Sequence, residues 1–375
     1  MEGKDPYFDL IMDEDLAVNK YPASLDSQKK LAKPSLCAQV MTKELFEKYK
    51  NHKTKSGWTI ARAINTGVKY AESITGCHAG DLESYRDFKD FFKPVIQLYH
   101  GFDMDTRKHI TDMNASKIKE KISESALAKI RSTRVRTARN LAGFPLNTSG
   151  TKETRLEIAA LMEKVFASLE GDLAGRFYRH TDQTPEQMQK LIDDHILFRG
   201  RDKMQAASGY HQHWPHGRGV FISHDRHFIS WINEGDHVRI ISMQEGGDIK
   251  SVFERLSRGV KAIEEGLKKI RGMDSVFMSD PALGMITCCP TNLGTALRGS
   301  VHILIPKLVS SIGFTKIDEI AYTMHCQARG TSGEHSEVID TIDVSNLRRL
   351  GFTEYELVND MIVCANKLAE MEDNA

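Results

Sequence analysis

Five arginines occur in short segments of small or β-branched residues, a setting typical of strands. Arg134 and Arg136 lie two positions apart, and the others are Arg239, Arg298 and Arg329. Because successive side chains of a strand alternate between its faces, Arg134 and Arg136 are predicted to share one face. A guanidinium stays protonated and binds phosphate oxygens with two parallel hydrogen bonds, so such a group could hold a polyphosphate. Taken singly, each arginine is more simply a surface partner of an acidic residue.

A second candidate is the thiol of Cys289, which ends a predicted strand and precedes Pro290 and Thr291. A ligand could reach a thiol in that position, and a neighbouring hydroxyl or cation would favour its thiolate. The ordinary alternative is a buried structural thiol, which is the fate expected of the preceding Cys288.

The third candidate is an acidic turn between two predicted strands, within residues 231–237. Its carboxylates, Glu234 and Asp236, could orient magnesium-bound water or hold a cationic substrate. The simpler interpretation is an ordinary polar hairpin turn.

Glycine-rich phosphate loops are missing from the sequence. It contains neither GxxxxGK[ST] nor a GxGxxG that follows a strand. If a nucleotide binds, its phosphates must therefore be held by side chains, and the arginines are the evident substitute.

Composition excludes other classes of function. The 51 basic and 51 acidic residues give a net charge of zero, so nucleic acid or a membrane is not attracted in bulk. The six cysteines show no CxxC pair and no zinc spacing, which indicates free thiols in a reducing compartment. Residues 1–20 lack the apolar core of a signal peptide, and no apolar run is long enough for a membrane helix. We therefore expect a cytoplasmic protein.

The elements that must position these residues follow from hydrophobic periodicity. Residues 1–20 are predicted to form an irregular arm, residues 21–105 a helical domain and residues 106–128 a polar linker. Strands and helices alternate over residues 129–375, and short turns between strands favour an antiparallel sheet with helices on it. Strands are predicted over 220–223, 227–233, 238–243, 285–289 and 300–305, and helices over 42–49, 82–99, 153–169, 184–195, 248–270 and 355–371.

Read in order, seven segments of the chain resemble the phosphagen kinases, the ATP:guanidino phosphotransferases. They are residues 132–136, 191–195, 214–219, 236–243, 289–295, 329–335 and 343–346. The resemblance runs from about Tyr21 to the C-terminus. It implies an α+β fold of the phosphagen kinase type, which is similar to glutamine synthetase: a small all-helical domain for the guanidino substrate (21–105) and a larger antiparallel-sheet domain (129–375) that binds ATP and carries catalysis.

The resemblance also implies roles for particular residues. Catalysis would involve Glu234, Glu334 and Cys289, whose thiolate lies against the guanidinium and is kept ionised by Thr291. Magnesium would be held by the phosphates of ATP and by water without a direct protein ligand, with Glu234 and Asp236 acting through water. The positions that match ATP contacts are Ser132, Thr133, Arg134, Val135, Arg136, His195, Arg239, Arg298, Gly299, Ser300, Val301, His302, Arg329, Gly330, Thr331, Ser332, Gly333 and Asp343.

The acceptor is expected to be a small guanidino compound. Matching positions are Ser73, Ile74, Thr75, Gly76, Cys77, His78, Tyr99, Gly235, Cys289 and Glu334. The short loop 70–80, together with Tyr99 and Glu334, is similar to arginine kinases, whereas residues 76–81 look more like creatine kinases. L-arginine is therefore the expected substrate, with lombricine and taurocyamine as alternatives, and both a monomer and a homodimer are compatible with the family.

One departure from the family pattern concerns catalysis. The pattern Asn-Glu-Glu-Asp is here Asn233-Glu234-Gly235-Asp236, so the carboxylate that would bond the guanidinium is missing. Loss of such a charged hydrogen bond costs roughly 10²–10³ in rate, which leaves a catalytically impaired nucleotide-binding relative as an alternative. A protein-arginine kinase is a further alternative, but those enzymes dispense with the helical domain that residues 21–100 predict here.

Overall fold

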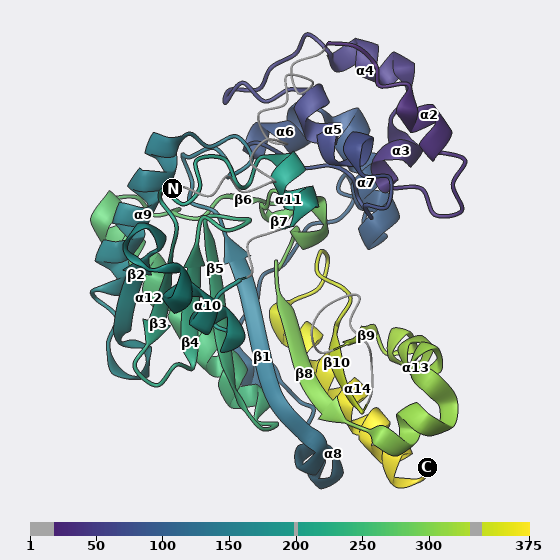
Figure 1. Ribbon diagram of the computed structural model, residues 1–375, viewed down its shortest axis with the longest axis vertical. Coiled ribbons are helices and arrows are strands. Elements are labelled where there is room, and N and C mark those ends of the chain that lie inside the picture. Colours follow the sequence, from purple (N-terminus) through teal and green to yellow (C-terminus); the bar gives the residue numbers. More distant parts are fainter. Residues whose placement is uncertain (1–18, 199–201, 331–339) are drawn as a thin grey trace.

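The computed structural model describes residues 19–198, 202–330 and 340–375. A helical N-terminal part sits above one end of a large sheet, and three long helices cover one side of that sheet (Figure 1). None of the helices in these described ranges is both long and apolar enough to cross a bilayer.

The N-terminal part is built from short helices. They are α2 (Ser24–Gln28), α3 (Leu36–Val40), α4 (Lys43–Tyr49), α5 (Ile60–Lys69), α6 (Leu82–Asp87) and α7 (Lys89–His100). Side-chain oxygens cap the first turns of α3, α4, α5 and α6. The helix predicted over 42–49 is confirmed as α4, and Thr42 caps it, because Thr42 Oγ1 accepts the N–H of Leu45 at 3.1 Å. The helix predicted over 82–99 is two helices, since Phe88 leaves the helical region at φ −105° and ψ 36° and buries its ring beside that of Tyr49.

The segment that follows α7 runs along the C-terminal helix, α14 (Glu354–Asp373). It contains the short helices η2 (Ala115–Lys117) and α8 (Glu124–Lys129). Its backbone bonds to polar side chains of α14: Asp112 N donates to Glu354 Oε2 at 2.7 Å and Ser123 N to Asn366 Oδ1 at 2.8 Å. Polar side chains of α14 thus accept hydrogen bonds from backbone N–H groups of this segment that no helix or strand pairs.

The larger part contains one antiparallel sheet of eight strands, which confirms the predicted α+β class. In spatial order the strands are β2 (Gly175–Arg179), β3 (Gly219–Ser223), β4 (Phe228–Ile232), β5 (Val238–Glu245), β1 (Ile130–Arg139), β8 (Arg298–Leu304), β10 (Thr341–Asn346) and β9 (Cys326–Gly330). The predicted hairpin is β3–β4, and Arg226 adopts a positive φ of 62° in its turn.

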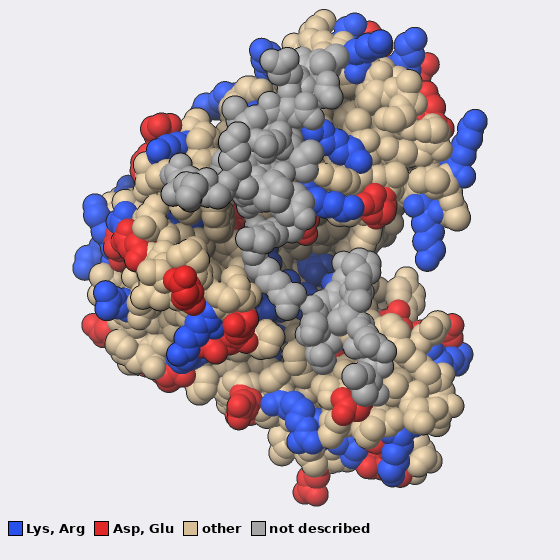
Figure 2. Space-filling view, viewed as in Figure 1, with Lys and Arg blue, Asp and Glu red and all other residues tan. Residues whose placement is uncertain are grey.

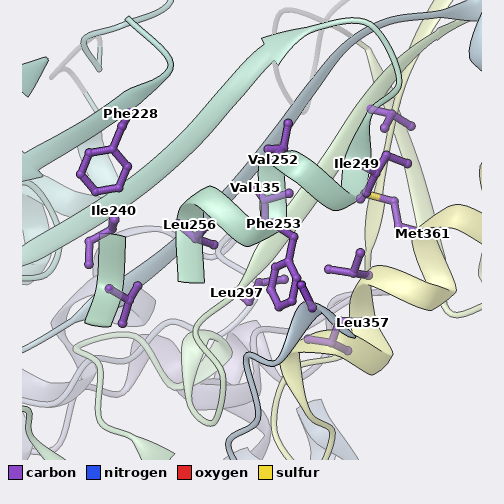
Figure 3. Packing of buried hydrophobic residues seen from close by; sticks show 14 of the residues in the cluster. Val135, Phe228, Ile240, Ile249, Val252, Phe253, Leu256, Leu297, Leu357 and Met361 are labelled. Carbon is purple, nitrogen blue, oxygen red and sulfur yellow. The ribbon is translucent and has the colours of Figure 1, made fainter. Parts of the chain in front are cut away.

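Helices cover the sheet unequally. The remaining helices are α9 (Lys152–Phe166), α10 (Pro185–Asp193), α11 (Lys203–Ser208), α12 (Ile249–Arg271) and α13 (Pro306–Thr323), with the 3₁₀ turns η3 (Gly171–Leu173), η4 (His180–Asp182) and η5 (Pro290–Asn292). Helices α9, α12 and α14 contact one face of the sheet, where Val135 of β1 packs with Phe253 of α12 and Met361 of α14 (Figure 3). The main core therefore lies on that face. A smaller apolar cluster, which includes Ile196, Ile229 and Ile241, covers the β3–β5 end of the opposite face, and the rest of that face carries polar groups.

The strand predicted over 285–289 is wrong beyond its first residue. Only Gly284–Met285 is extended, as β7, and it pairs with β6 (Ser279–Asp280). The next residues turn toward the N-terminal part, where Tyr85 Oη donates to Thr287 O and Ala79 N to Cys288 O, both at 2.8 Å. These bonds replace a strand ladder and join the two parts of the chain just before Cys289.

Candidate active site

The strand register brings the predicted arginines onto the face of the sheet opposite the main core. Arg136 of β1 lies directly opposite Arg298 of β8, and Arg239 of β5 lies opposite Ala138 on the other side of β1. Arg329 of β9 lies opposite Asp343 of β10, two strands further along. The period-two prediction for Arg134 and Arg136 is confirmed, since Val135 between them lies in the main core.

The electrostatics of this face are those of an anion site. Burial lowers the pKa of Arg134 to about 10, and repulsion from Arg298 and Arg239 adds to the effect. Burial and repulsion from Arg239 and Arg134 hold the pKa of Arg136 well below its ordinary value. Arginine remains charged at neutral pH even so. Excess positive charge is therefore confined at one point of the sheet, and an anion would relieve it.

Arg239 and Arg298 form ion pairs with carboxylates. Arg298 Nη2 donates to Asp343 Oδ2 at 2.6 Å, and Arg239 Nη2 lies 2.9 Å from Glu234 Oε2. Within the described ranges, no carboxylate forms an ion pair with Arg134 or Arg136. The Nε atoms of Arg134, Arg239 and Arg298 are buried and have no hydrogen-bond partner in this part of the chain. Donors of this kind fit phosphate oxygens.

The Trp231 ring packs against two of the arginines, and no sequence pattern assigned it to the site. Trp231 lies opposite Arg239 in the β4–β5 register, and its ring is 5.3 Å from the Arg134 guanidinium and 5.8 Å from that of Arg239. An aromatic face attracts a cation, so the indole helps to hold both groups in place. Trp231 lies two positions after Ile229 in β4, and this spacing could have indicated only that the two side chains share a face.

A sixth arginine, Arg349, also lines the pocket and was missed. The pocket is formed by Arg136, Thr137, Ala138, Arg239, Asn292, Ala296, Arg298 and Arg349. Arg349 is buried, and burial lowers its pKa, with Tyr99 opposing the effect and Arg298 and Arg329 reinforcing it. It belongs to an irregular segment after β10, where no periodicity signals which way a side chain points.

The acidic turn lies beside the arginines. Glu234 Oε2 accepts the N–H of Gly235 at 2.6 Å, and Oε1 accepts a bond from Gln205 of α11 at 3.1 Å. Burial alone would raise the pKa of Glu234, but Arg239 and these hydrogen bonds outweigh it, so the pKa lies below its ordinary value. The carboxylate is therefore ionised at neutral pH.

Asp236 occupies a buried position behind the turn. Its Oδ1 accepts bonds from Asn140 Nδ2 at 2.8 Å and from Cys288 N at 3.0 Å. Burial raises its pKa against the effect of these bonds. The carboxylate thus fixes the backbone that precedes Cys289, while its predicted action on magnesium-bound water stays a prediction.

Cys289 is half-buried, and Cys288 is fully buried, as expected. Cys289 Sγ lies 3.2 Å from Thr291 Oγ1. The Cys288 thiol turns the other way and donates to Gly235 O at 3.3 Å. The accessible thiol and its neighbouring hydroxyl are therefore brought to the same site as the acidic turn.

Gly235 is not required by its backbone conformation, since its φ is not positive. A Cβ at this position would lie 3.4 Å from Arg239 Nη2 and 3.5 Å from Tyr210 Cε2, which is ordinary contact. A side chain therefore fits at position 235, beside Arg239 and Tyr210.

The loop expected to meet the guanidino substrate, residues 70–80, lies next to Cys288 and Cys289. Ser73, Thr75, Gly76, Cys77 and His78 are buried, whereas Ile74 is 60% exposed. Leu36 N and Cys37 N donate to the carbonyls of Ile74 and Thr75 at 2.9 and 2.8 Å, which ties the loop to α3.

His78 in this loop is a neutral imidazole. Its Nδ1 lies 3.2 Å from Thr66 Oγ1, and its ring makes an edge contact with that of Tyr210. Burial lowers its pKa to about 4. His78 therefore presents no charge to a substrate at neutral pH.

Some predicted ATP contacts can act only through their backbone. Thr133 donates to Gly246 O, and Val135 and Val301 lie in the main core. Gly299 N donates to Asn346 Oδ1 at 2.7 Å. On the arginine face, Asp343 is buried, and His302 and Ser132 are half-buried. Thr331, Ser332, Gly333 and Glu334 lie outside the described residues.

Figure 2 shows a hollow between the helical N-terminal part and the part of the sheet that carries β8 to β10, with basic side chains inside it. His195, which follows α10 with a φ of 58°, is exposed. The arginines, the acidic turn and the thiol therefore form one charged site at the junction of the two parts.

Known proteins share this arrangement. Residues 32–97 match the N-terminal domain of ATP:guanido phosphotransferases, and residues 157–375 match the C-terminal catalytic domain of the same family. An arginine kinase of Stichopus japonicus is 39% identical over 355 residues, which are 94% of each chain. An arginine kinase of Anthopleura japonica is 42% identical over 343 residues, and there the match spans 90% of this chain but 46% of the longer relative.

Solved structures agree with the sequence matches. A lombricine kinase superposes with a TM-score of 0.84 at 36% identity, over 91% of this chain and 92% of its own. The substrate-free duplicated taurocyamine kinase of Schistosoma mansoni gives a TM-score of 0.82 at 35% identity, over 93% of this chain and 49% of its own. Fold, site and relatives agree, and the chain belongs to the ATP:guanido phosphotransferases, the phosphagen kinases.

Proposed function

We propose that this phosphagen kinase reversibly transfers the γ-phosphoryl group of MgATP to the guanidinium of L-arginine. The observation that carries the proposal is the cluster of half-buried arginines whose buried Nε atoms lack partners within the described ranges, next to the half-buried thiol of Cys289. Positive charge on one side of a pocket and acidic groups with a thiol on the other suit a triphosphate and a cation.

In this proposal Arg134, Arg136, Arg239, Arg298 and Arg329 bind the phosphates, and Arg349 joins them from the irregular segment. When bound, Mg²⁺ would supply further charge neutralisation while phosphate oxygens and water hold it, with Glu234 nearby. The confined positive charge is present before any ligand binds, so the donors need little rearrangement to meet the transferring phosphoryl group.

The acceptor would be held on the opposite side of the site. Cys289 as thiolate and Glu234 would orient the guanidinium through charge-assisted hydrogen bonds. A guanidinium nitrogen attacks the γ-phosphorus, the bond between that phosphorus and the bridging oxygen breaks, and ADP leaves. The proton of the attacking nitrogen passes to the thiolate or to a carboxylate.

Arginine is favoured among guanidino compounds by the short buried loop over the thiol and by Tyr99, which lies beside Arg349. The arginine kinases among the relatives support it, whereas the lombricine and taurocyamine kinases keep those compounds as the main alternatives. The alternative of an impaired nucleotide-binding relative has no support in these comparisons. The six free cysteines suit a reducing cytoplasm, which is the proposed location.

A coupled assay tests this proposal by offering MgATP with arginine, lombricine, taurocyamine, glycocyamine and creatine in parallel. We expect the highest kcat/KM with arginine, and Cys289→Ala provides the matched inactive control. Phosphorylation of creatine alone would refute the choice of arginine. Measurable ATP binding without transfer to any of the five would refute the activity itself.

A further inference from the structure

Cys289 has a second hydroxyl beside it, from the N-terminal part of the chain. Thr75 Oγ1 lies 3.8 Å from Cys289 Sγ, within hydrogen-bonding distance for sulfur, although the two residues are 214 positions apart. Thr291 Oγ1 lies 3.2 Å from the same sulfur. The thiol is therefore in contact with one hydroxyl from its own segment and one from the loop above it.

The backbone on both sides of this contact is held firmly. On the loop side, Thr75 O accepts the N–H of Cys37 at 2.8 Å. On the thiol side, Cys288 O accepts the N–H of Ala79 at 2.8 Å, and Pro290 O lies 2.8 Å from His100 Nε2. Residues immediately before and after Cys289 are thus bonded to the N-terminal part, so the approach of the two side chains is fixed by the fold.

The Thr75 side chain has little other reason to be polar. It is 5% exposed, and within the described ranges the Cys289 thiol is the one hydrogen-bond partner of its hydroxyl. A buried hydroxyl without an acceptor is unfavourable, and valine would fill the same volume without that cost. A thiolate is a much stronger acceptor than a neutral thiol, so the contact gains strength when Cys289 ionises.

We propose that Thr75 is a positioning residue that donates a second hydrogen bond to the Cys289 thiolate. The idea rests on the proposed function, in which that thiolate faces the guanidinium. Because Gly235 contributes no carboxylate, the thiolate carries more of the interaction with the cation. A second donor on the sulfur fixes its direction toward the junction of the two parts of the chain.

The test measures the alkylation rate of Cys289 by iodoacetamide as a function of pH, with the modified peptide quantified by mass spectrometry. The other five cysteines are buried, so Cys289 is the site expected to react. In Thr75→Val the midpoint of the pH profile should rise by about 0.5–1 pH unit, the shift that corresponds to one lost hydrogen bond. Thr75→Ser keeps the hydroxyl and should keep the original midpoint.

Thr75→Ala provides a second removal of the hydroxyl, in case the valine variant folds poorly, and should give the same rise. An unchanged midpoint in the valine and alanine variants would overturn the proposal, as would a serine variant that shifts as far as the valine variant. The assay uses the ligand-free full chain and needs no turnover. Failure of the kinase proposal would appear separately, as absence of transfer to every guanidino compound.

Discussion

Arg136 and Arg298 lie directly opposite each other on neighbouring strands, so two guanidinium groups leave the same point of one sheet face. Such a pair raises the free energy of the ligand-free protein, because burial and repulsion both disfavour the charged form. The ligand-free protein is therefore less stable than it would be without this pair, and the anion site exists before a ligand binds.

Replacing Arg136 should therefore separate stability from binding. Arg136→Met removes a half-buried charge that lacks a carboxylate partner within the described ranges, so we expect a thermal midpoint a few degrees higher without ligand. The same variant should bind ATP roughly 10²-fold more weakly, since two charge-assisted hydrogen bonds are lost. Thermal melts with and without MgATP measure both effects. Arg131→Met on the same strand is exposed and serves as the control, with neither effect expected.

Restoring a carboxylate at Gly235 should raise the rate. The position accepts a side chain without strain, and a glutamate there would bond the guanidinium acceptor. We expect kcat of Gly235→Glu to rise roughly tenfold or more. Gly235→Gln has the same size without the charge and should not reproduce the rise. An equal or lower kcat in the glutamate variant would mean that the site works around glycine.

Asp81 should stabilise the loop that carries Thr75. Its carboxylate accepts Ser84 N at 2.8 Å and Ser56 N at 3.2 Å, along with the hydroxyl of Thr54, and it is 3% exposed. Asp81→Ala leaves these donors unpaired and should lower the free energy of unfolding by roughly 2–4 kcal/mol, with a raised KM for the guanidino substrate.

Urea unfolding and steady-state kinetics measure the two effects of the Asp81 variant. Glu47→Ala in the same part of the chain is exposed and provides the control. A variant at position 81 that is as stable as this control would contradict the structural role of the carboxylate.

Acid should destabilise the protein through His237. Leu141 N donates to its Nδ1 at 3.0 Å, its Nε2 lies 2.9 Å from Pro145 O, and burial lowers its pKa from 6.5 to about 3. Between these values the unfolded chain binds a proton that the native protein does not, so stability is present above pH 6.5 and is lost as pH falls. The loss from this residue is about 1.4 kcal/mol per pH unit.

Urea midpoints measured across this pH range check the prediction. His237→Asn keeps an acceptor for Leu141 but cannot bind the proton, so its stability should fall less steeply with acid. Parallel slopes for the two proteins would show that another group is responsible.

The sequence anticipated local features well and contacts between distant residues poorly. The alternation around Arg134 and Arg136 placed both on one face, and the helices predicted from residues 42 and 248 begin there, with Thr42 and Asp248 as their caps. The strand expected over 285–289 failed, because its backbone bonds to the N-terminal part instead of to a strand. Periodicity describes one segment at a time and contains no information about such partners.

By itself, the sequence determined the family, the α+β class, the starts of the helices at residues 42 and 248 and the shared face of Arg134 and Arg136. These features depend on neighbouring residues and on motifs read along the chain. Only the tertiary structure decided that Arg298 lies opposite Arg136, that Arg349 lines the pocket and that Thr75 reaches Cys289. Strand register and the packing of the two parts set those distances, and both result from the burial of the whole core rather than from any single segment.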